Sequence, residues 1–450
     1  MKREIKTNRK DAFIAVFKVI VLVQFLVILM EIILPANSIY ENGAYRFLIN
    51  IGFYFLVLFI SLFIRDVFKN RSRQSSKNRL AYLSIKKLYF LLNISSLLGF
   101  FGVSFILFDR VFLKNIDYSL GLRHARYQWV NAKSPSIFSE LLSMFGNAIV
   151  PMAFITVLLL YLYWEEIEKK FRLKRLIVSI SSVFLFAAMN GSRSIIFIQV
   201  FLLLCISILR LSKNKKLIPA AKKNKKSDKK FFIIFMLSVI YALGMFKSSS
   251  KLGNIDSKSL FEIFIVDLGG KPKTGYYSII NSIIGPDSII YHVFSAITYL
   301  IHSQWTSEGL ISLTNRSGNI FSYSIMHFLY KLGILNSAPE SYQFYGLFIS
   351  LPGAVAYDFG IVGVLIFGVS YGVLLGLSIL KIEKPNNSGG FDFATIMFVL
   401  SSILVAPFFV AHNFIYFNFI IIDMVILEII SRVFIRKSTW LYLDKEKTLE

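Results

Sequence analysis

The 450-residue sequence is poor in cysteine, in acidic residues and in the short motifs that mark nucleotide or metal sites. Its single cysteine, Cys205, lies inside an apolar run, which excludes an intrachain disulfide and a cysteine-based metal site. No Walker loop, no GxGxxG after a strand and no HExxH occurs, so the sequence predicts neither a metal nor a cofactor.

Acidic residues are also scarce, with 26 Asp and Glu against 50 Lys and Arg, a formal net charge of +24. Such an excess can indicate a nucleic-acid partner, but no basic stripe is interleaved with stacking aromatics outside the apolar runs. No nucleic-acid partner is therefore predicted. The excess is better explained by basic residues that stay on the cytoplasmic side of a membrane.

What the sequence has in abundance is apolar side chains, 55% of all residues, gathered in runs long enough to cross a bilayer. This predicts an all-α polytopic membrane protein, a single integral membrane domain over residues 1–450. The first run is too long for a cleaved signal peptide and is expected to remain as a span. The predicted spans are residues 12–34, 46–64, 88–108, 144–164, the two arms of 175–210, 231–246, 354–380, 391–410 and 414–435.

Ten spans place both termini on one side, and 35 of the 50 lysines and arginines fall on that side. The positive-inside rule makes it cytoplasmic. Residues 1–246 then carry spans one to seven, 247–350 form a long outer segment with amphipathic helices, 351–435 carry spans eight to ten, and 436–450 form a cytoplasmic tail. The most basic link, 210–230, is expected to be a disordered cytoplasmic loop.

The arms of 175–210 form a tight hairpin with Arg193 at its tip, 18 positions after Arg175 and 17 before Arg210. Each arm is about 26 Å long, close to one bilayer core. Because a guanidinium is costly in hydrocarbon, the tip must lie at the far interface or face a watery cavity. Planar arginine suits bidentate binding of phosphate oxygens, although it can also simply reach lipid phosphates.

The outer segment contains a predicted helix over 288–306 that is apolar except for one stripe. Steps of three and four residues put the stripe on one face, where it lines a cavity or merely faces water. The run is too short to span, so the helix is expected to lie in the outer interface or to re-enter the membrane. The stripe consists of His292, Ser295, Tyr299, His302 and Thr306.

All five histidines fall on the predicted outer side, where proton-transfer chemistry would then be concentrated. They are His124, His292, His302, His327 and His412. His124 lies between Arg123 and Arg126 in an outer stretch that also contains Tyr127 and Trp129. Arginines hold phosphates and aromatics stack on sugar rings, so a lipid-linked saccharide fits this mixture. A solvated basic loop near anionic headgroups explains the same residues.

Three features together resemble a known family: the tip Asn190 to Ser194, the helix around Tyr299 and His302, and the motif Tyr357 to Gly360 leading into a span with Gly363, Gly368, Gly372 and Gly376. In this order and topology the chain resembles the oligosaccharide repeat unit polymerases, the Wzy-type O-antigen polymerases. The resemblance implies a metal-independent GT-C-like glycosyltransferase of the bacterial inner membrane, with its active site facing the periplasm. Its substrate would be an undecaprenyl-pyrophosphate-linked oligosaccharide within the membrane lipid, and a chain-length regulator protein is a further implied partner.

The resemblance also implies roles for single residues. Arg193 would contact the pyrophosphate, Tyr299 and His302 would line the sugar cavity, and Asp358 would mark the outer end of its span. The chemistry requires a base for the attacking hydroxyl and cations for the leaving pyrophosphate. His302, or alternatively His124 or Asp358, is the expected base. The predicted site residues are catalytic Arg193, His302 and Asp358, and substrate-binding Arg123, His124, Arg126, His292 and Tyr299.

Two other functions fit parts of the pattern. An O-antigen ligase would share the bundle and a basic, histidine-containing outer cavity. A flippase for the lipid-linked unit should instead carry polar residues along the middle of several spans and short loops. Here Lys18, Gln24 and Glu31 are confined to one span, and a long outer segment follows the seventh.

The predicted topology can be tested with alkaline phosphatase fusions, because this enzyme is active only outside the cytoplasm. A fusion near Gly253 should be active and one near Lys222 inactive, since the basic link is expected inside. The opposite pattern of activities would overturn the predicted orientation.

Overall fold

The computed structural model describes residues 12–71, 85–119, 121–132, 135–192, 194–212, 255–313, 318–331, 333–383 and 391–430, with a few single residues between 233 and 244. Within these ranges seven helices are long and apolar enough to cross a membrane. They confirm seven of the ten predicted runs and a polytopic, almost wholly helical membrane protein. The seven are Ala12–Ile33, Gly43–Phe68, Lys87–Leu113, Ile137–Leu162, Lys169–Asn190, Ser194–Ser212 and Leu351–Glu383.

The three other predicted runs have different outcomes. Run 231–246 lies largely outside the described residues. Run 391–410 was wrong as one continuous helix, because α15 (Phe391–Val405) has only 15 residues and ends before Pro407. Proline lacks the N–H that a helix interior needs. The last run is helical over 415–430, up to the end of the described residues.

The bundle is built from long apolar helices whose side chains are buried against one another in one continuous core. The fourth predicted span is two helices in series, since Pro151 occupies the first position of the second one, where its missing N–H costs nothing. The helices of the bundle are α1 (Ala12–Ile33), α2 (Gly43–Arg71), α3 (Ile85–Phe108), α5 (Ile137–Ile149), α6 (Pro151–Leu162), α7 (Lys169–Asn190), α8 (Ser194–Ser212), α14 (Leu351–Glu383) and α15.

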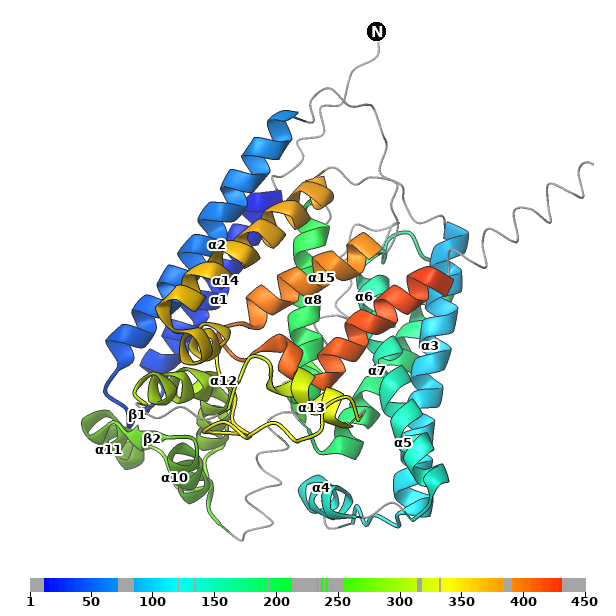
Figure 1. Cartoon of the computed structure of the whole chain (residues 1–450). Helices are drawn as coiled ribbons and strands as arrows, with labels where there is room; N and C mark the ends of the chain where they lie inside the picture. The colour runs from blue at the N-terminus through cyan, green and yellow to red at the C-terminus, as the bar shows by residue number, and fades with distance from the viewer. Residues whose placement is uncertain are drawn as a thin grey trace, which may run out of the picture.

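The shorter elements gather at one end of the bundle, the lower end in Figure 1, together with the α7–α8 tip. We call it the distal end. It holds a two-stranded antiparallel ribbon, β1 (Ala36–Ser38) with β2 (Gly270–Pro272), in which Asn37 lies opposite Lys271. The other distal elements are the π-helix η2 (Asp109–Leu113), α4 (Leu122–Asn131), α10 (Ser257–Asp267), α11 (Thr274–Ile283), α12 (Ile289–Ile311), α13 (Tyr323–Lys331) and the 3₁₀ turn η3 (Ala411–Asn413).

The outer stretches that the sequence predicts on one side of the membrane therefore lie together. Helix α12 is longer than the predicted 288–306, and residues 301–310 are all buried. This burial agrees with a helix that enters the protein rather than lying on its surface.

Glycines fix the contact between α14 and α2. Gly368, Gly372 and Gly376 recur every four residues and face Leu56, Ile60 and Ile64 of α2. A Cβ atom on Gly372 would lie 2.7 Å from the Cβ of Ile60, so the two backbones approach more closely than any other residue would permit. Small residues allow such close packing between helices in a membrane.

We expect Gly372→Ala to destabilise the protein by about 1–3 kcal/mol, because the added methyl group overpacks the α2–α14 contact. Gly52→Ala is the matched control, since a Cβ at this α2 position meets no atom within 4 Å. The measurement is thermal unfolding of purified protein in detergent. Equal melting temperatures for the two variants would show that the contact tolerates the methyl group.

Candidate functional site

The polar stripe of α12 is packed inside the protein. His292, Ser295, His302 and Thr306 are only 4%, 1%, 2% and 1% exposed. The alternative that the stripe merely faces water is therefore wrong for these four residues, while its lining of a substrate cavity stays a prediction. Other elements cover the face that carries the stripe, whereas Ile289, Ile290 and Val293 on the other faces are 62%, 38% and 38% exposed. A periodicity along one helix does not reveal which face is covered.

His292 lies away from the other predicted site residues. Its Nε2 is 3.1 Å from the hydroxyl oxygen of Ser257 on α10. Ten residues, or about 15 Å of helix, separate it from His302. The structure therefore does not bring His292 into a common site with His302, and its contact supports the packing of α10 on α12.

His302 has backbone partners on both ring nitrogens. Nδ1 lies 2.9 Å from the carbonyl oxygen of Tyr299, and Nε2 lies 3.1 Å from the backbone nitrogen of Phe348. The pair of contacts fits a neutral ring that donates from Nδ1 and accepts at Nε2. The nitrogen that would accept a proton is thus occupied by a backbone N–H, and the ring holds the chain at Phe348.

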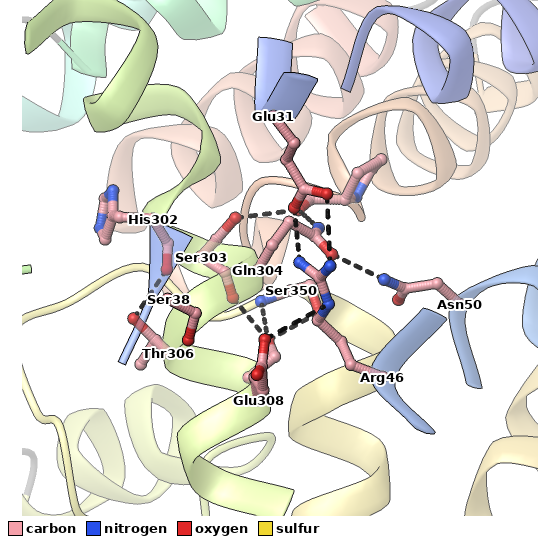
Figure 2. Close-up of polar contacts among 12 residues, drawn as sticks. Glu31, Ser38, Arg46, Asn50, His302, Ser303, Gln304, Thr306, Glu308 and Ser350 are labelled. Carbon is pink, nitrogen blue, oxygen red and sulfur yellow. Dashed lines mark hydrogen bonds and ion pairs between the residues drawn. The ribbon is translucent and has the colours of Figure 1, made fainter. Parts of the chain in front are cut away.

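The C-terminal half of α12 carries a polar network, shown in Figure 2. Arg46 forms a two-pronged ion pair with Glu31, at 2.5 and 3.3 Å, and its Nε lies 3.9 Å from Glu308. Asn50 donates to the side-chain oxygen of Gln304 at 2.6 Å, and Gln304 donates to the carbonyl of Pro407. These contacts attach α12 to α1, α2 and the segment after α15.

Burial raises the pKa of Glu308, with Arg46 opposing and Glu31 adding to that rise. A groove of about 250 Å³ between α1 and α2 ends at this network, where Glu31, Arg46, Asn50 and Gln304 line it. The rest of its lining is mostly aliphatic and aromatic. Because Arg46 is already paired with Glu31, this groove presents no unpaired cation to an anionic ligand. The network is therefore best explained as the anchor of α12.

A second cavity, of about 210 Å³, lies at the distal end and is lined by aromatic rings. Three tyrosines, Tyr323, Tyr342 and Tyr345, have ring centroids 5.0 to 5.5 Å apart. Three phenylalanines also line it, with centroids 4.5 to 5.6 Å apart: Phe348, Phe409 and Phe414. Asn413 and Ser324 add polar groups. We call it the aromatic pocket.

The segment Ile320 to Phe321 supports the wall of the aromatic pocket, and the N–H and C=O groups of both residues are hydrogen-bonded to side chains. Asp358 accepts from the N–H groups of Ile320 and Phe321 at 2.9 and 2.7 Å. His412 Nε2 lies 2.6 Å from the carbonyl of Phe321, and the amide of Asn413 donates to that of Ile320 at 3.0 Å. Both peptide groups are thus fixed on both sides, and Asp358 acts on the pocket through the backbone.

The tip of the α7–α8 hairpin packs on α4. Gly191 ends α7 in the left-handed conformation, φ 53°, and a Cβ there would lie 2.7 Å from the carbonyl oxygen of Leu122. Arg126 donates to the carbonyl of Gly191 at 3.3 Å. The structure therefore brings together the tip and the basic helix that the sequence singled out. Arg193 itself, and the side chain of Arg123, lie outside the described residues.

A second arginine supports the tip from within. Arg110, in the π-helix, is 2% exposed and donates to the carbonyl of Met189 and to the side-chain oxygen of Asn190, the latter at 2.9 Å. Its guanidinium lies 4.1 Å from the ring centroid of Trp129 on α4. Single π-turns often occur at functional sites. Here the turn places a buried cation that holds the end of α7.

The tip and the aromatic pocket are connected through stacked rings. Phe197 of α8 stacks on Tyr299 of α12 at 5.9 Å, and Tyr299 lies 5.2 Å from Phe348 in the pocket wall. Tyr416, two residues after Phe414, packs on Phe186 of α7 at 5.0 Å. The hairpin, α12 and the pocket therefore form one continuous structure.

No family model, curated protein or solved structure matches this chain. The arrangement of side chains at the distal end is therefore what supports a functional assignment. Within the described residues no three His, Cys, Asp or Glu side chains gather as a metal site would require.

Sequence reasoning missed the pocket, Arg46 and the buried structural role of Arg110, which the sequence offers only as one of the basic residues of an outer stretch. One signal was available for the pocket, since tyrosines recur in the predicted outer segment at positions 323, 330, 342 and 345. His124 lies on α4, the helix that packs on the tip, with Nε2 3.1 Å from the amide nitrogen of Gln128 on the same helix.

The burial of His412 makes a prediction about pH. Burial lowers the pKa of His412 below its ordinary value of 6.5, against a smaller opposing effect of its hydrogen bond to Phe321. The neutral ring is thus favoured in the folded state, so stability is full above pH 6.5 and is lost as the pH falls below it. His412→Gln keeps an amide donor near the position of Nε2 and should flatten this pH dependence of the melting temperature in detergent. An unchanged slope in the variant would exclude His412 as its source.

Proposed function

We propose that this chain is a polymerase of lipid-linked oligosaccharides. It would join undecaprenyl-pyrophosphate-linked repeat units into O-antigen or capsular polysaccharide at the periplasmic face of a bacterial inner membrane. In this proposal it has ten spans in a GT-C-like arrangement with both termini cytoplasmic. The observation that carries it is the pairing, at one end of a membrane bundle, of an arginine-bearing hairpin tip with an aromatic pocket.

The reaction requires two binding functions and one proton acceptor. A hydroxyl oxygen of the acceptor sugar attacks the anomeric carbon of the donor and forms the new C–O bond. The bond from that carbon to the pyrophosphate oxygen breaks, and the pyrophosphate leaves on its lipid with the electron pair. The hydroxyl proton passes to a base on the protein. Charge grows on the leaving oxygen, so cations fixed beside it accelerate the step.

The hairpin tip is suited to the leaving group. Arg126 is an exposed residue and donates one N–H to the Gly191 carbonyl, so its guanidinium is held at the tip. Arg193 follows Gly191 by two residues, and Arg123 precedes Arg126 by three. Both would supply further contacts to phosphate. Arg110 is buried and positions the tip without touching substrate.

Among the three candidate bases, we assign the proton to His124. His302 and Asp358 are both engaged by backbone N–H groups, which cannot move away from them without unfolding the segment. His124 contacts the Gln128 side chain, and a side chain can change rotamer when substrate binds. His302 and Asp358 thereby become positioning residues for the aromatic pocket.

The sharpest test concerns Arg193. If it stabilises the leaving pyrophosphate, Arg193→Ala should abolish the polysaccharide ladder, a loss of about 10²-fold or more in rate for one transition-state contact. Arg193→Lys keeps the charge but loses the bidentate fork and should restore only part of the ladder. The measurement is ladder density from a complemented deletion strain, normalised to immunoblotted membrane protein.

The matched control is Arg175→Ala at the foot of the same hairpin, where Arg175 donates to the hydroxyl of Ser96 at 2.9 Å. A lower amount of inserted protein from both alanine variants, with full ladder per molecule, would show that Arg193 only anchors the hairpin. A ladder reduced to one repeat unit on the lipid A core supports a polymerase, whereas loss of all capping indicates a ligase or a flippase.

A further inference from the structure

We propose that the aromatic pocket binds a single uncharged sugar ring, the acceptor sugar of the polymerase reaction. This rests on the proposed function only for the role of the ring in catalysis. The binding site itself is inferred from the geometry of the pocket.

Aromatic residues account for six of the thirteen residues that line the pocket, in two groups. The tyrosine group offers hydroxyls as well as faces, and the phenylalanine group offers faces alone. A pyranose has an apolar C–H face and a rim of hydroxyls, so it can stack on one group and donate to the other. An alkyl chain would offer no hydrogen bond to the hydroxyl of Tyr342, which disfavours a lipid tail.

The loop that carries two of the tyrosines is bent into place by unusual backbone. Phe344 has φ 62°, a left-handed conformation that is uncommon outside glycine, and Gly346 has φ 93°. Between them the N–H of Tyr345 bonds to the carbonyl of Tyr342 at 3.2 Å. Such conformations are often retained at ligand sites. Here the turn brings Tyr342 and Tyr345 onto the same cavity as Tyr323.

Asn413 supplies a buried acceptor that has no partner among the described residues. Its amide nitrogen donates to the carbonyl of Ile320, and its backbone carbonyl accepts from Ser324 at 3.3 Å, so the residue is held through both its side chain and its backbone. The side-chain oxygen, Oδ1, is buried and accepts no hydrogen bond within the described part of the chain. A buried acceptor left unpaired is costly, and this one belongs to a residue that lines the pocket.

The charge of the pocket selects against acidic sugars. None of its described lining residues is Lys, Arg, Asp or Glu. The nearby Asp358 contributes, after burial and the two neighbouring phenols, to raising the pKa of Tyr342 to about 12, so this phenol stays a neutral donor. A carboxylate on the ligand would have no cation to pair with among the described lining residues, and the negative charge of Asp358 would repel it.

The size of the pocket limits the ligand to one ring. Its volume of about 210 Å³ is below the range of roughly 300–1,000 Å³ found for sites that enclose drug-sized ligands. A disaccharide would therefore have one ring inside and the next outside. The outside ring would extend over the exposed Tyr345, which is 58% exposed.

The test is saturation-transfer NMR on the full chain in lipid nanodiscs, because sugar-headed detergents would compete for the site. The probes are methyl glucoside, methyl N-acetylglucosaminide and methyl glucuronide. We expect saturation of at least one uncharged glycoside and binding of the glucuronide at least about fivefold weaker, the size of one lost polar contact. Tyr345→Ala should weaken the uncharged probe about fivefold, whereas Tyr345→Phe should keep most of its binding.

The matched control is Tyr330→Ala, since Tyr330 is another exposed tyrosine, 39% exposed, on α13 but outside the pocket lining. Equal saturation in Tyr345→Ala and Tyr330→Ala, no binding of either uncharged probe, or a glucuronide that binds as well as the glucosides would overturn the proposal. The polymerase role is tested separately, by the ladder of the Tyr345→Ala strain. A deletion strain with a full ladder would remove the proposed function and leave the binding result standing.

Discussion

The structure depends on the burial of the polar half of α12. Residues 301–310 are all enclosed, and they include Ser303, Gln304, Thr306, Ser307 and Glu308. Polar groups that leave water must find protein partners, and those on this helix find them in different parts of the chain. Gln304 is bound by α2 and by Pro407, and Ser307 by Ser350. One helix thereby fixes the relative positions of α1, α2, the loop before α14 and the segment after α15.

The aromatic pocket follows from the same constraint. His302 on α12 holds Phe348, and Asp358 at the start of the α14 span holds the backbone of Ile320 and Phe321. Because Gly360 interrupts α14 at φ 67°, the short helix that carries Asp358 can turn toward this segment while the rest of α14 packs on α2. The motif Tyr357 to Gly360 therefore has a structural role, which is to shape the pocket.

The sequence predicted correctly those features that depend on neighbouring residues, such as the apolar runs of the seven long helices. The sequence predicts the hairpin tip and the basic stretch around Arg126 on the same side of the membrane, and in the structure they are in contact. The prediction was possible because successive spans run in alternate directions, so each link between spans lies at one of two ends of the bundle. The roles of His302 and His292 were harder to predict. A stripe of polar residues looks the same on a helix that faces water and on one whose polar groups are bound to neighbouring elements.

The sequence by itself determined that the chain is a polytopic helical membrane protein and where seven of its long helices run, because the length of an apolar run and the positions of charges are properties of contiguous residues. It also indicated which links share an end. Only the tertiary structure decided that Tyr323, Tyr342 and Phe414 line one pocket and that the nitrogens of His302 are occupied. Apart from the local contact of His302 with Tyr299, those facts depend on residues that lie 19 to 91 positions apart in the sequence. No local pattern encodes which buried polar group will satisfy another.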